Sequence, residues 1–290
     1  MGKMYSRVAK KDNRNYPVNV EYYNSANDVV DDLMVRELKQ GGWHPPKEDE
    51  EWTGCKNFDE ALEFLRTGYS PVVEKLEHEF KIANQQTRDG KRITFKNNIL
   101  GYSPVVPLAM MGVPNSMVDM TMKPIKTKVV DIYYDMTANC GVSSDSIIKA
   151  GLSVLSVICD LERQGYRFNL FAVQTYCDED DCDCLIVKIK DAKQPIDLRR
   201  MSFPLCHTGF FRLIGFDWYG KNPHSVYRSC YGHEISREFQ GNAIKDFTKA
   251  VFGDTAIFLR CDKLVRLDSD EKKTYLKEVL TNVGKGNNEY

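Results

Sequence analysis

Three oxygen-bearing side chains, Asp135, Thr137 and Asn139, occupy alternate positions just after a β-rich run. The run, Val129 to Tyr134, is typical of a strand, and a helix-start signal follows at Ser144. Alternate residues of an extended segment share one face, so the three side chains could converge on one point. Their oxygens suit a hard cation such as Mg²⁺ or Ca²⁺. The same residues also suit a turn that only caps the next helix.

A strand–helix–strand pattern surrounds this triplet and would position it. Residues 128–135 are nearly continuously apolar, residues 145–164 form a helical pattern with a narrow polar stripe, and residues 167–175 form a second strand. This order predicts a right-handed parallel βαβ unit. Because ligands bind beyond the carboxyl ends of parallel strands, the position favours a ligand-facing loop. Residues 184–190 are expected to pair antiparallel with 167–175, as an edge strand.

The remaining segments complete an α/β pattern. We expect a strand at 256–260 and helices near 196–214, 240–251 and 269–282. In the first half we expect a basic, solvated tail at 1–16 and a short strand at 17–23. Three helices should follow, at 25–39, 57–66 and 71–84, and then a loop-rich stretch at 85–126. The sequence therefore predicts an N-terminal, mainly helical α+β region over 1–126. An α/β domain over 127–290 would follow, with a mostly parallel sheet and helices on both faces.

Composition limits the classes of function. The 40 basic and 41 acidic side chains nearly cancel, which argues against nucleic acid and anionic membranes as partners. No run of about 18 apolar residues predicts a membrane span, and no signal core is seen near the first residue. Gly2 and Ser6 have the myristoylation spacing, without a supporting second signal. The nine cysteines are scattered, so we expect free thiols in a reducing cytoplasm.

Two further clusters carry residue types used in chemistry. Cysteines flank an acidic run from Cys177 to Cys184, with Cys206-His207 and Cys230-x-x-His233 downstream, but their spacing is not that of a zinc site. An acidic hairpin turn with buried thiols is the favoured interpretation. Five residues further along the chain are of types used in nucleophilic catalysis: Cys206, His207, Asp217, His224 and His233. No nucleophile elbow, phosphate loop or dinucleotide fingerprint accompanies them.

The order of strand, Asp-x-Thr-x-Asn, buried helix, strand and antiparallel edge strand resembles the von Willebrand factor A-like (vWA-like, Rossmann-like) fold. That family carries Asp-x-Ser-x-Ser after its first strand as a metal-ion-dependent adhesion site. Asp135 matches the Asp, Thr137 the first Ser and Asn139 the second. The family also supplies a later Thr and an Asp after a central strand, matched here by Thr208 and Asp262, although the usual Asp-Gly is absent. The resemblance implies a degenerate site for Mg²⁺ or Ca²⁺.

A wider resemblance covers most of the chain. The blocks at 52–61, 101–107, 111–117, 195–198 and 211–216 are similar to those of an uncharacterised family found largely in bacteriophage genomes. This resemblance implies a phage-encoded protein that acts in the host cytoplasm or in the virion, and it implies no known activity.

Three functions remain open from these observations. The first is a non-enzymatic module that binds a host or phage protein, whose carboxylate would complete the coordination of a cation at Asp135. The second is a metal-dependent phosphoester hydrolase, with Asp262 or His207 beside Asp135. The third is a structural virion or assembly protein that uses the fold as a scaffold. The sequence leaves the oligomeric state undefined.

Overall fold

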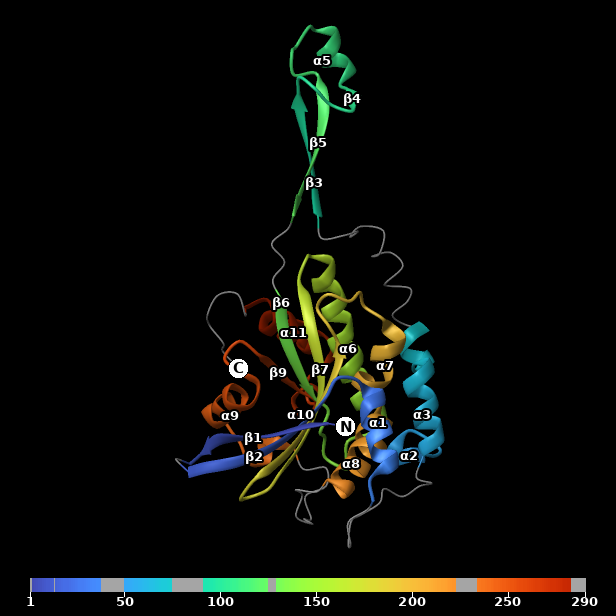
Figure 1. The fold of residues 1–290 in the computed structure, drawn as a ribbon, viewed down its shortest axis with the longest axis vertical. Coiled ribbons are helices and arrows are strands. Elements are labelled where there is room, and N and C mark those ends of the chain that lie inside the picture. The colour runs from blue at the N-terminus through green and yellow to red at the C-terminus, as the bar shows by residue number, and fades with distance from the viewer. Residues whose placement is uncertain are drawn as a thin grey trace.

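A six-stranded mixed sheet organises the chain, and a second, three-stranded sheet stands apart from it (Figure 1). The computed structural model describes residues 2–12, 14–37, 50–74, 91–124, 129–222 and 234–282. The large sheet has the order β1-β2-β8-β7-β6-β9. Its strands are β1 Lys3–Lys11, β2 Arg14–Tyr23, β6 Val129–Asp135, β7 Arg167–Cys177, β8 Cys182–Lys190 and β9 Ile257–Arg260.

Strand directions divide the large sheet into two parallel groups. Strand β6 runs parallel to β7 and to β9, and β2 runs parallel to β8. The pairs β7–β8 and β1–β2 are antiparallel. The predicted parallel pair and its antiparallel neighbour are therefore confirmed. The prediction that β8 lies at the edge is wrong, because β2 pairs with its free side.

The N-terminal residues are strands rather than a solvated tail. Strand β1 pairs with β2 along its whole length, and the side chains of Ala9, Tyr16 and Val18 are buried against the segment that contains helix α9 Asn242–Phe252. The tail prediction fails because Ala9 is the one buried residue of β1, so the strand shows little apolar periodicity among its charged residues. Both strands come from the predicted N-terminal region, yet they belong to the large sheet. The predicted boundary between residues 126 and 127 lies outside the described residues.

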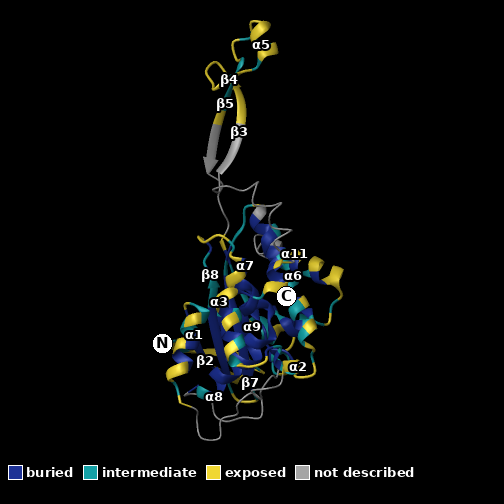
Figure 2. Cartoon of the chain, turned by 90° about the vertical axis from the view of Figure 1, so that its right-hand side faces the viewer, coloured by how far each residue is buried: buried dark blue, intermediate teal, exposed yellow. Residues whose placement is uncertain are grey.

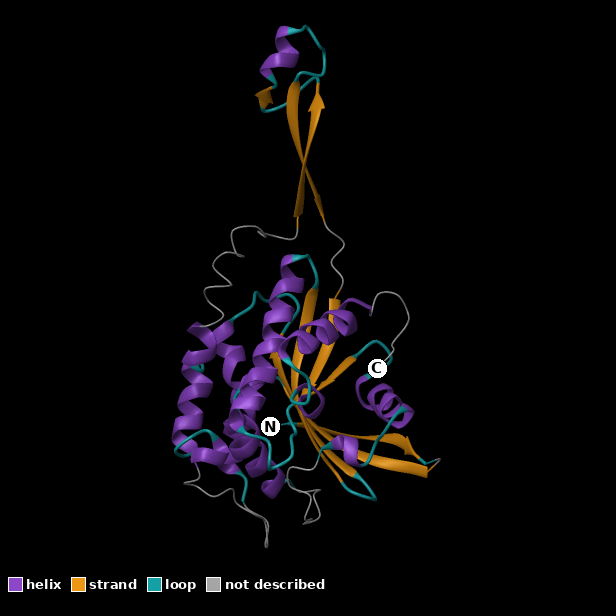
Figure 3. Ribbon diagram, turned by 180° about the vertical axis from the view of Figure 1, so that it is seen from behind, coloured by secondary structure: helices purple, strands orange, loops and turns teal. Residues whose placement is uncertain are grey.

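Helices cover the two faces of the large sheet unequally (Figure 3). Alternate strand residues such as Ile132, Leu170 and Val187 pack beneath most of the helices, whereas Phe171 and Ile186 pack beneath α9 and the short 3₁₀ helix Ile235–Arg237. Helices on both faces are therefore confirmed. The heavily covered face carries α1 Ala26–Val35, α3 Phe58–Thr67, α6 Ser144–Arg163, α7 Leu198–Cys206, α8 Phe216–Lys221, α10 Cys261–Leu264 and α11 Ser269–Asn282. Helix α2 Glu50–Thr53 and a π-helical turn Phe210–Gly215 complete this layer.

Local signals set several helix boundaries as predicted. Ser25 caps α1 by accepting a hydrogen bond from the Asp28 N–H, and Asn57 caps α3 by accepting one from the Glu60 N–H. The Glu60 carboxylate accepts the Lys56 N–H in return. Residues 70–74 are helical as expected after Gly68, and the predicted extension to 84 lies outside the described residues.

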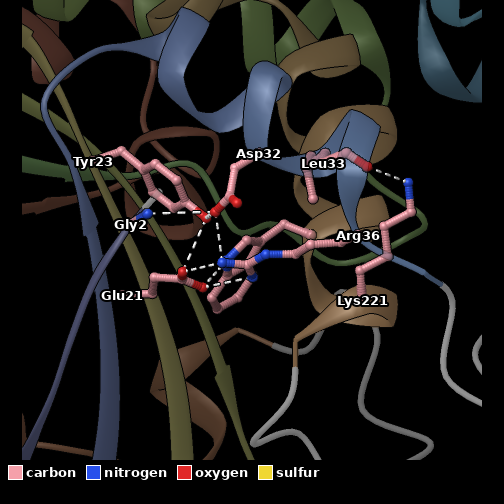
Figure 4. A network of polar contacts seen from close by, with 8 residues as sticks. Gly2, Glu21, Tyr23, Asp32, Leu33, Arg36 and Lys221 are labelled. Carbon is pink, nitrogen blue, oxygen red and sulfur yellow. Dashed lines mark hydrogen bonds and ion pairs between the residues drawn. The ribbon is translucent and has the colours of Figure 1, made fainter.

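A buried network of polar side chains attaches α1 to β2 (Figure 4). The Glu21 carboxylate, 3% exposed, accepts hydrogen bonds from Arg36, Tyr23 and the Trp218 indole. Asp32 accepts from Arg36 and Tyr23, each at 2.6 Å. The charges are thus buried with their partners, which is the condition under which burial of a carboxylate is tolerated. The network joins β2, α1 and α8 into one unit.

The three-stranded sheet consists of β3 Lys91–Asn98, β4 Ser103–Pro104 and β5 Met117–Pro124, with helix α5 Val106–Met110 at its far end (Figures 1 and 2). We call residues 91–124 the β-arm. Its order is β3-β5-β4, and all pairs are antiparallel. Short strands were predicted in this stretch, but their assembly into a separate sheet was not. In Figure 2 the residues of α5 are coloured mostly as exposed, whereas the buried residues lie in the body.

Two further expectations concern the cysteines and the membrane. Cys177 and Cys182 face each other across the β7–β8 turn and form a disulfide, so the expectation of free thiols throughout is wrong at this pair. The close pairing of the two strands brings the thiols together, which spacing alone did not reveal. None of the described helices is long and apolar enough to cross a membrane.

Close packing of α6 on α7 depends on Gly151. A Cβ at this position would lie 2.2 Å from the Leu205 carbonyl oxygen. We therefore expect Gly151→Ala to lower the free energy of unfolding by about 1–3 kcal/mol through overpacking. Within an uncrowded helix the same change stabilises by about 1 kcal/mol, so the sign is informative. Urea denaturation measures the difference.

Gly141→Ala is the matched control for this substitution. A Cβ there meets only Asn139 Oδ1, at an ordinary 3.6 Å. The control should change the free energy of unfolding by less than about 0.5 kcal/mol. A stabilising effect of Gly151→Ala would contradict the close helix contact.

Candidate functional site

Asp135 ends β6 in the interior of the protein rather than on an open loop. Its side chain is 1% exposed, and residues 136–138 are equally buried. The Met136 N–H donates to the Val173 carbonyl at 3.0 Å, which continues the pairing of β6 with β7 beyond the strand. The expectation of a wholly ligand-facing loop is therefore corrected, because this pairing carries the first two residues of the triplet inside.

Both oxygens of the Asp135 carboxyl group have partners within the chain. Oδ1 accepts the Thr137 N–H at 2.9 Å, and Oδ2 accepts the Thr175 hydroxyl at 2.7 Å. Thr137 Oγ1 accepts the Thr175 N–H at 3.1 Å. The three residues form a closed hydrogen-bonded group between β6 and β7. The sequence predicts Thr175 as the last residue of a strand, and its polar side chain gives no distinct signal there, because Asn169 and Gln174 in the same strand are polar too.

The carboxyl group of Asp135 is a weaker acid than that of an ordinary aspartate. Burial raises its pKa to about 7, against the opposing effect of the hydrogen bonds from Thr137 and Thr175, and the charge of Asp262 adds to the increase. A carboxyl group in this state holds a proton at mildly acidic pH. A cation bound by this carboxylate would have to compete with that proton.

The other predicted ligands have separate local partners. Asn139 is exposed, and its Oδ1 accepts the Gly141 N–H at 3.0 Å within its own turn. The Thr208 hydroxyl donates to the Thr53 carbonyl at 2.9 Å. Asp262 is 2% exposed, accepts the Ser236 hydroxyl at 2.8 Å and lies 3.7 Å from Arg260 Nε. The structure thus brings Thr137 to Asp135 and places Asp262 close enough to influence it, and it directs Asn139 and Thr208 to other contacts.

The donor set around Asp135 fits a resident cation poorly as it stands. Among the described residues, no group of three or more His, Cys, Asp or Glu side chains has the geometry to hold a metal ion. Mg²⁺ and Ca²⁺ prefer several oxygen ligands, with more than one carboxylate in a tight site. Ligation at Asp135 and its predicted companions stays a prediction.

A buried thiol and imidazole lie side by side near this region. Cys55 Sγ is 3.8 Å from His207 Nδ1, and the Gly209 N–H donates to the same nitrogen at 3.0 Å. Gly54, with φ +74°, and Gly209 allow the close approach, since a Cβ on either would collide with the neighbouring loop. The pairing joins residues 152 positions apart, so no local sequence pattern could reveal it.

The electrostatics of this pair do not favour catalysis. Burial raises the pKa of the Cys55 thiol to about 12 and lowers the pKa of the His207 imidazole to about 4. Aromatic rings of Phe64, Tyr69 and Phe203 surround the imidazole. At neutral pH the pair is a neutral thiol beside a neutral imidazole, whereas a nucleophilic cysteine requires a lowered pKa. The predicted candidates His224 and His233, with Cys230, lie outside the described residues.

Comparison with known proteins gives one family. A model of the family described as "Domain of unknown function (DUF7192)" matches residues 9–286. The chain belongs to this family. The match extends from β1 past α11, so it includes the β-arm as well as the large sheet. No curated protein and no solved structure matches the chain. The description of the family states no activity, and the A-like identity and phage origin stay predictions.

The pKa changes of Asp135 and His207 predict opposite effects of pH on stability. Asp135 binds its proton more tightly when folded, so its contribution to the free energy of unfolding falls between about pH 4 and 7. His207 binds its proton less tightly when folded, so its contribution rises between about pH 4 and 6.5. Each amounts to a change on the order of 3 kcal/mol. In the wild type the two partly cancel.

Single substitutions should separate these contributions. Asp135→Asn keeps an oxygen acceptor for the Thr137 N–H, its NH₂ group can donate to the Thr175 hydroxyl, and it should make stability rise more steeply from pH 4.5 to 6.5. His207→Asn keeps an acceptor for the Gly209 N–H and should make stability fall over the same interval. Urea denaturation at several pH values measures both slopes. An unchanged slope in Asp135→Asn would show that folding does not protonate this carboxyl group.

Proposed function

We propose that the chain is a phage-encoded, non-enzymatic protein-interaction module that binds its partner through the β-arm. The observation that carries the proposal is the concentration of exposed apolar side chains on the arm. Of the thirteen large hydrophobic residues that are exposed in the described structure, eight lie on it: Phe95, Ile99, Leu100, Tyr102, Val106, Met110, Met111 and Met120. A concentration of exposed large apolar residues on one part of a protein is typical of a protein-binding site.

The architecture of the β-arm supports this proposal. None of the residues in α5 is buried, so the helix at the end of the arm has no core of its own. Small antiparallel sheets need a covered apolar face to be stable, and the arm presents such a face to solvent. Met110 and Met111 are 84% and 76% exposed, and flexible thioether side chains adapt well to an apolar partner surface. An apolar groove on a host or phage protein fits this surface.

The body of the protein supports a non-enzymatic role. The hydrolase alternative requires a general base or a second metal near Asp135. His207, one of the two candidates for this role, has a pKa of about 4, and its ring is enclosed by aromatic side chains. Asp262, the other candidate, lies near Asp135 but is buried and accepts the Ser236 hydroxyl at 2.8 Å. General bases act most effectively with a pKa near the working pH. The scaffold alternative, in which the protein is a virion component, uses the same β-arm contact and differs in where the partner is found.

Removal of the exposed side chains should abolish partner binding without loss of stability. We expect the triple variant Leu100→Ser, Met110→Ser, Met111→Ser to lose the protein captured by the wild type from cells that contain this chain. Its free energy of unfolding should stay within about 0.5 kcal/mol of the wild type, because the three residues are exposed. Affinity capture with quantitative mass spectrometry measures the loss.

A matched control uses two exposed apolar residues of the body. Met34→Ser with Val35→Ser removes similar surface, 60% and 78% exposed, from α1. This control should retain the captured protein. Equal capture by the triple variant would refute the role of the β-arm. Concentration-dependent dimers in sedimentation velocity that disappear in the triple variant would replace the foreign partner by a second copy.

A cation at the Asp135 loop is a second part of the proposal. The supporting observation is the presence of two buried carboxyl groups, Asp135 and Asp262, at the ends of the neighbouring strands β6 and β9. A cation, or a cation together with a partner carboxylate, would compete with the proton on Asp135. Binding of Mg²⁺ or Ca²⁺ should therefore be stronger at pH 8 than at pH 6.

Isothermal calorimetry with MgCl₂ and CaCl₂ tests this expectation. Binding heat in the wild type at pH 8 should be absent from Asp135→Asn. If the wild type shows no binding heat at pH 8, the metal part is refuted, and the β-arm proposal is unaffected because its test is independent.

A further inference from the structure

The strands of the large sheet have their carboxyl ends at two opposite ends of the sheet. Strands β6, β7 and β9 end together near Asp135. Strands β2 and β8 are parallel to each other, but β8 is antiparallel to β7. The carboxyl ends of β2 and β8 therefore lie at the opposite end of the sheet. The loops after Tyr23 and Lys190 therefore meet there. Ligands of α/β proteins commonly bind where parallel strands end and a helix begins.

A groove of about 790 Å³ lies at the carboxyl ends of β2 and β8. The loop from β2 to α1 forms one side, with Asn24 and Ser25, and the end of β8 with the loop that follows forms another. The end of α3 and the start of α7 contribute Arg66 and Arg200. Its size is that of pockets that hold small ligands. It is separate from the buried group at Asp135 and from the β-arm.

The walls of the groove are strongly cationic. Five of the lining residues are basic and one is acidic: Arg66, Lys188, Lys190, Lys193 and Arg200 against Asp191. This excess contrasts with the chain as a whole, whose formal net charge is −1. A concave site lined by one sign of charge focuses the field and attracts ligands of the opposite charge.

Some of these cations are held by carboxylates, and others are exposed at the mouth. Lys190 is 3% exposed and donates to Glu162 at 2.6 Å, and Lys188 donates to Asp191 at 2.6 Å. These pairs fix the base of the groove. Arg66 and Lys193 are exposed, and Arg200 lies 3.5 Å from Asp197 with both side chains largely exposed. An exposed pair of this kind contributes little, so Arg200 can exchange Asp197 for a ligand.

The start of α1 adds donors to the same groove. Helix α1 begins at Ala26, two residues beyond Asn24, and Ser25 and Asn27 line the groove beside it. A helix N-terminus directs backbone N–H groups and a positive partial charge towards a ligand. Asp28, in the first turn, opposes this effect in part, and its own N–H is taken by Ser25. The cationic side chains therefore carry most of the expected attraction.

We propose that the groove between the α1 start, the end of β8 and the residues Arg66, Lys193 and Arg200 binds a small ligand that carries phosphate groups. Arginine and lysine at the mouth would form charge-assisted hydrogen bonds with phosphate oxygens. A groove of about 790 Å³ has room for a ligand of nucleotide or polyphosphate size. This site is additional to the proposed protein-binding surface of the β-arm.

Binding of inorganic tripolyphosphate tests the proposal. Isothermal calorimetry at constant ionic strength should show one site in the wild type. The double variant Lys193→Glu, Arg200→Glu should weaken binding by about tenfold or more, since each lost charge-assisted contact is worth about 1 kcal/mol or more. Both residues are exposed, so the variant should fold, which its melting temperature verifies. Arg66→Glu gives an independent second test on another element.

The matched control reverses two exposed lysines elsewhere, Lys10→Glu on β1 and Lys273→Glu on α11, with the same change in net charge. Its affinity for tripolyphosphate should stay within about twofold of the wild type. Equal weakening in the control would reduce the effect to overall charge and overturn the proposal. Absence of tripolyphosphate binding, or tighter binding of a single-stranded oligonucleotide at the same residues, would also overturn the assignment of a small ligand. Binding should persist in the β-arm triple variant, which separates this site from the proposed function.

Discussion

The parallel pairing of β2 with β8 is the constraint on which the rest of the structure depends. It brings residues 14–23 beside a strand that lies more than 150 positions further along the chain. The pairing covers the side of β8 that would otherwise be an open edge, a position that natural sheets protect. It also holds the C-terminal half of α1 in place, because Glu21 and Tyr23 at the end of β2 bind Asp32 and Arg36 in the buried network. Because of this pairing, the carboxyl ends of β2 and β8 lie side by side, and the cationic groove forms there.

The polar groups inside the body serve to hold elements together. Asp135, Thr137 and Thr175 join β6 to β7, and Cys55 with His207 joins the segment before α3 to the segment after α7. In both places burial shifts the pKa towards the neutral form of the side chain, because a charged form would lose its hydration without a full set of compensating contacts. Residue types that carry chemistry in other proteins thus act here as internal hydrogen-bonding groups. The β-arm and the groove are the surfaces for which we propose binding.

The described residues form a body with a buried core, built on the large sheet, and an exposed projection, the β-arm. The body buries two clusters of apolar side chains, one on each face of the large sheet. The β-arm leaves most of its large described apolar residues exposed to solvent, which is costly for a free protein and would be offset by the proposed partner. The family match over residues 9–286 includes both parts. The arm therefore belongs to the family unit together with the sheet.

The sequence by itself determined the local elements, because their signals are local. Apolar periodicity predicted β6, α6, β7 and β8, and capping residues predicted the starts of α1 and α3. It placed Asp135 at a strand end for the same reason. It could not show that Thr175 lies opposite, that Cys55 meets His207, or that β2 pairs with β8, since these contacts join distant segments. The tertiary structure decided whether each polar group faces solvent or its own chain, because burial and charge depend on the neighbours that folding supplies.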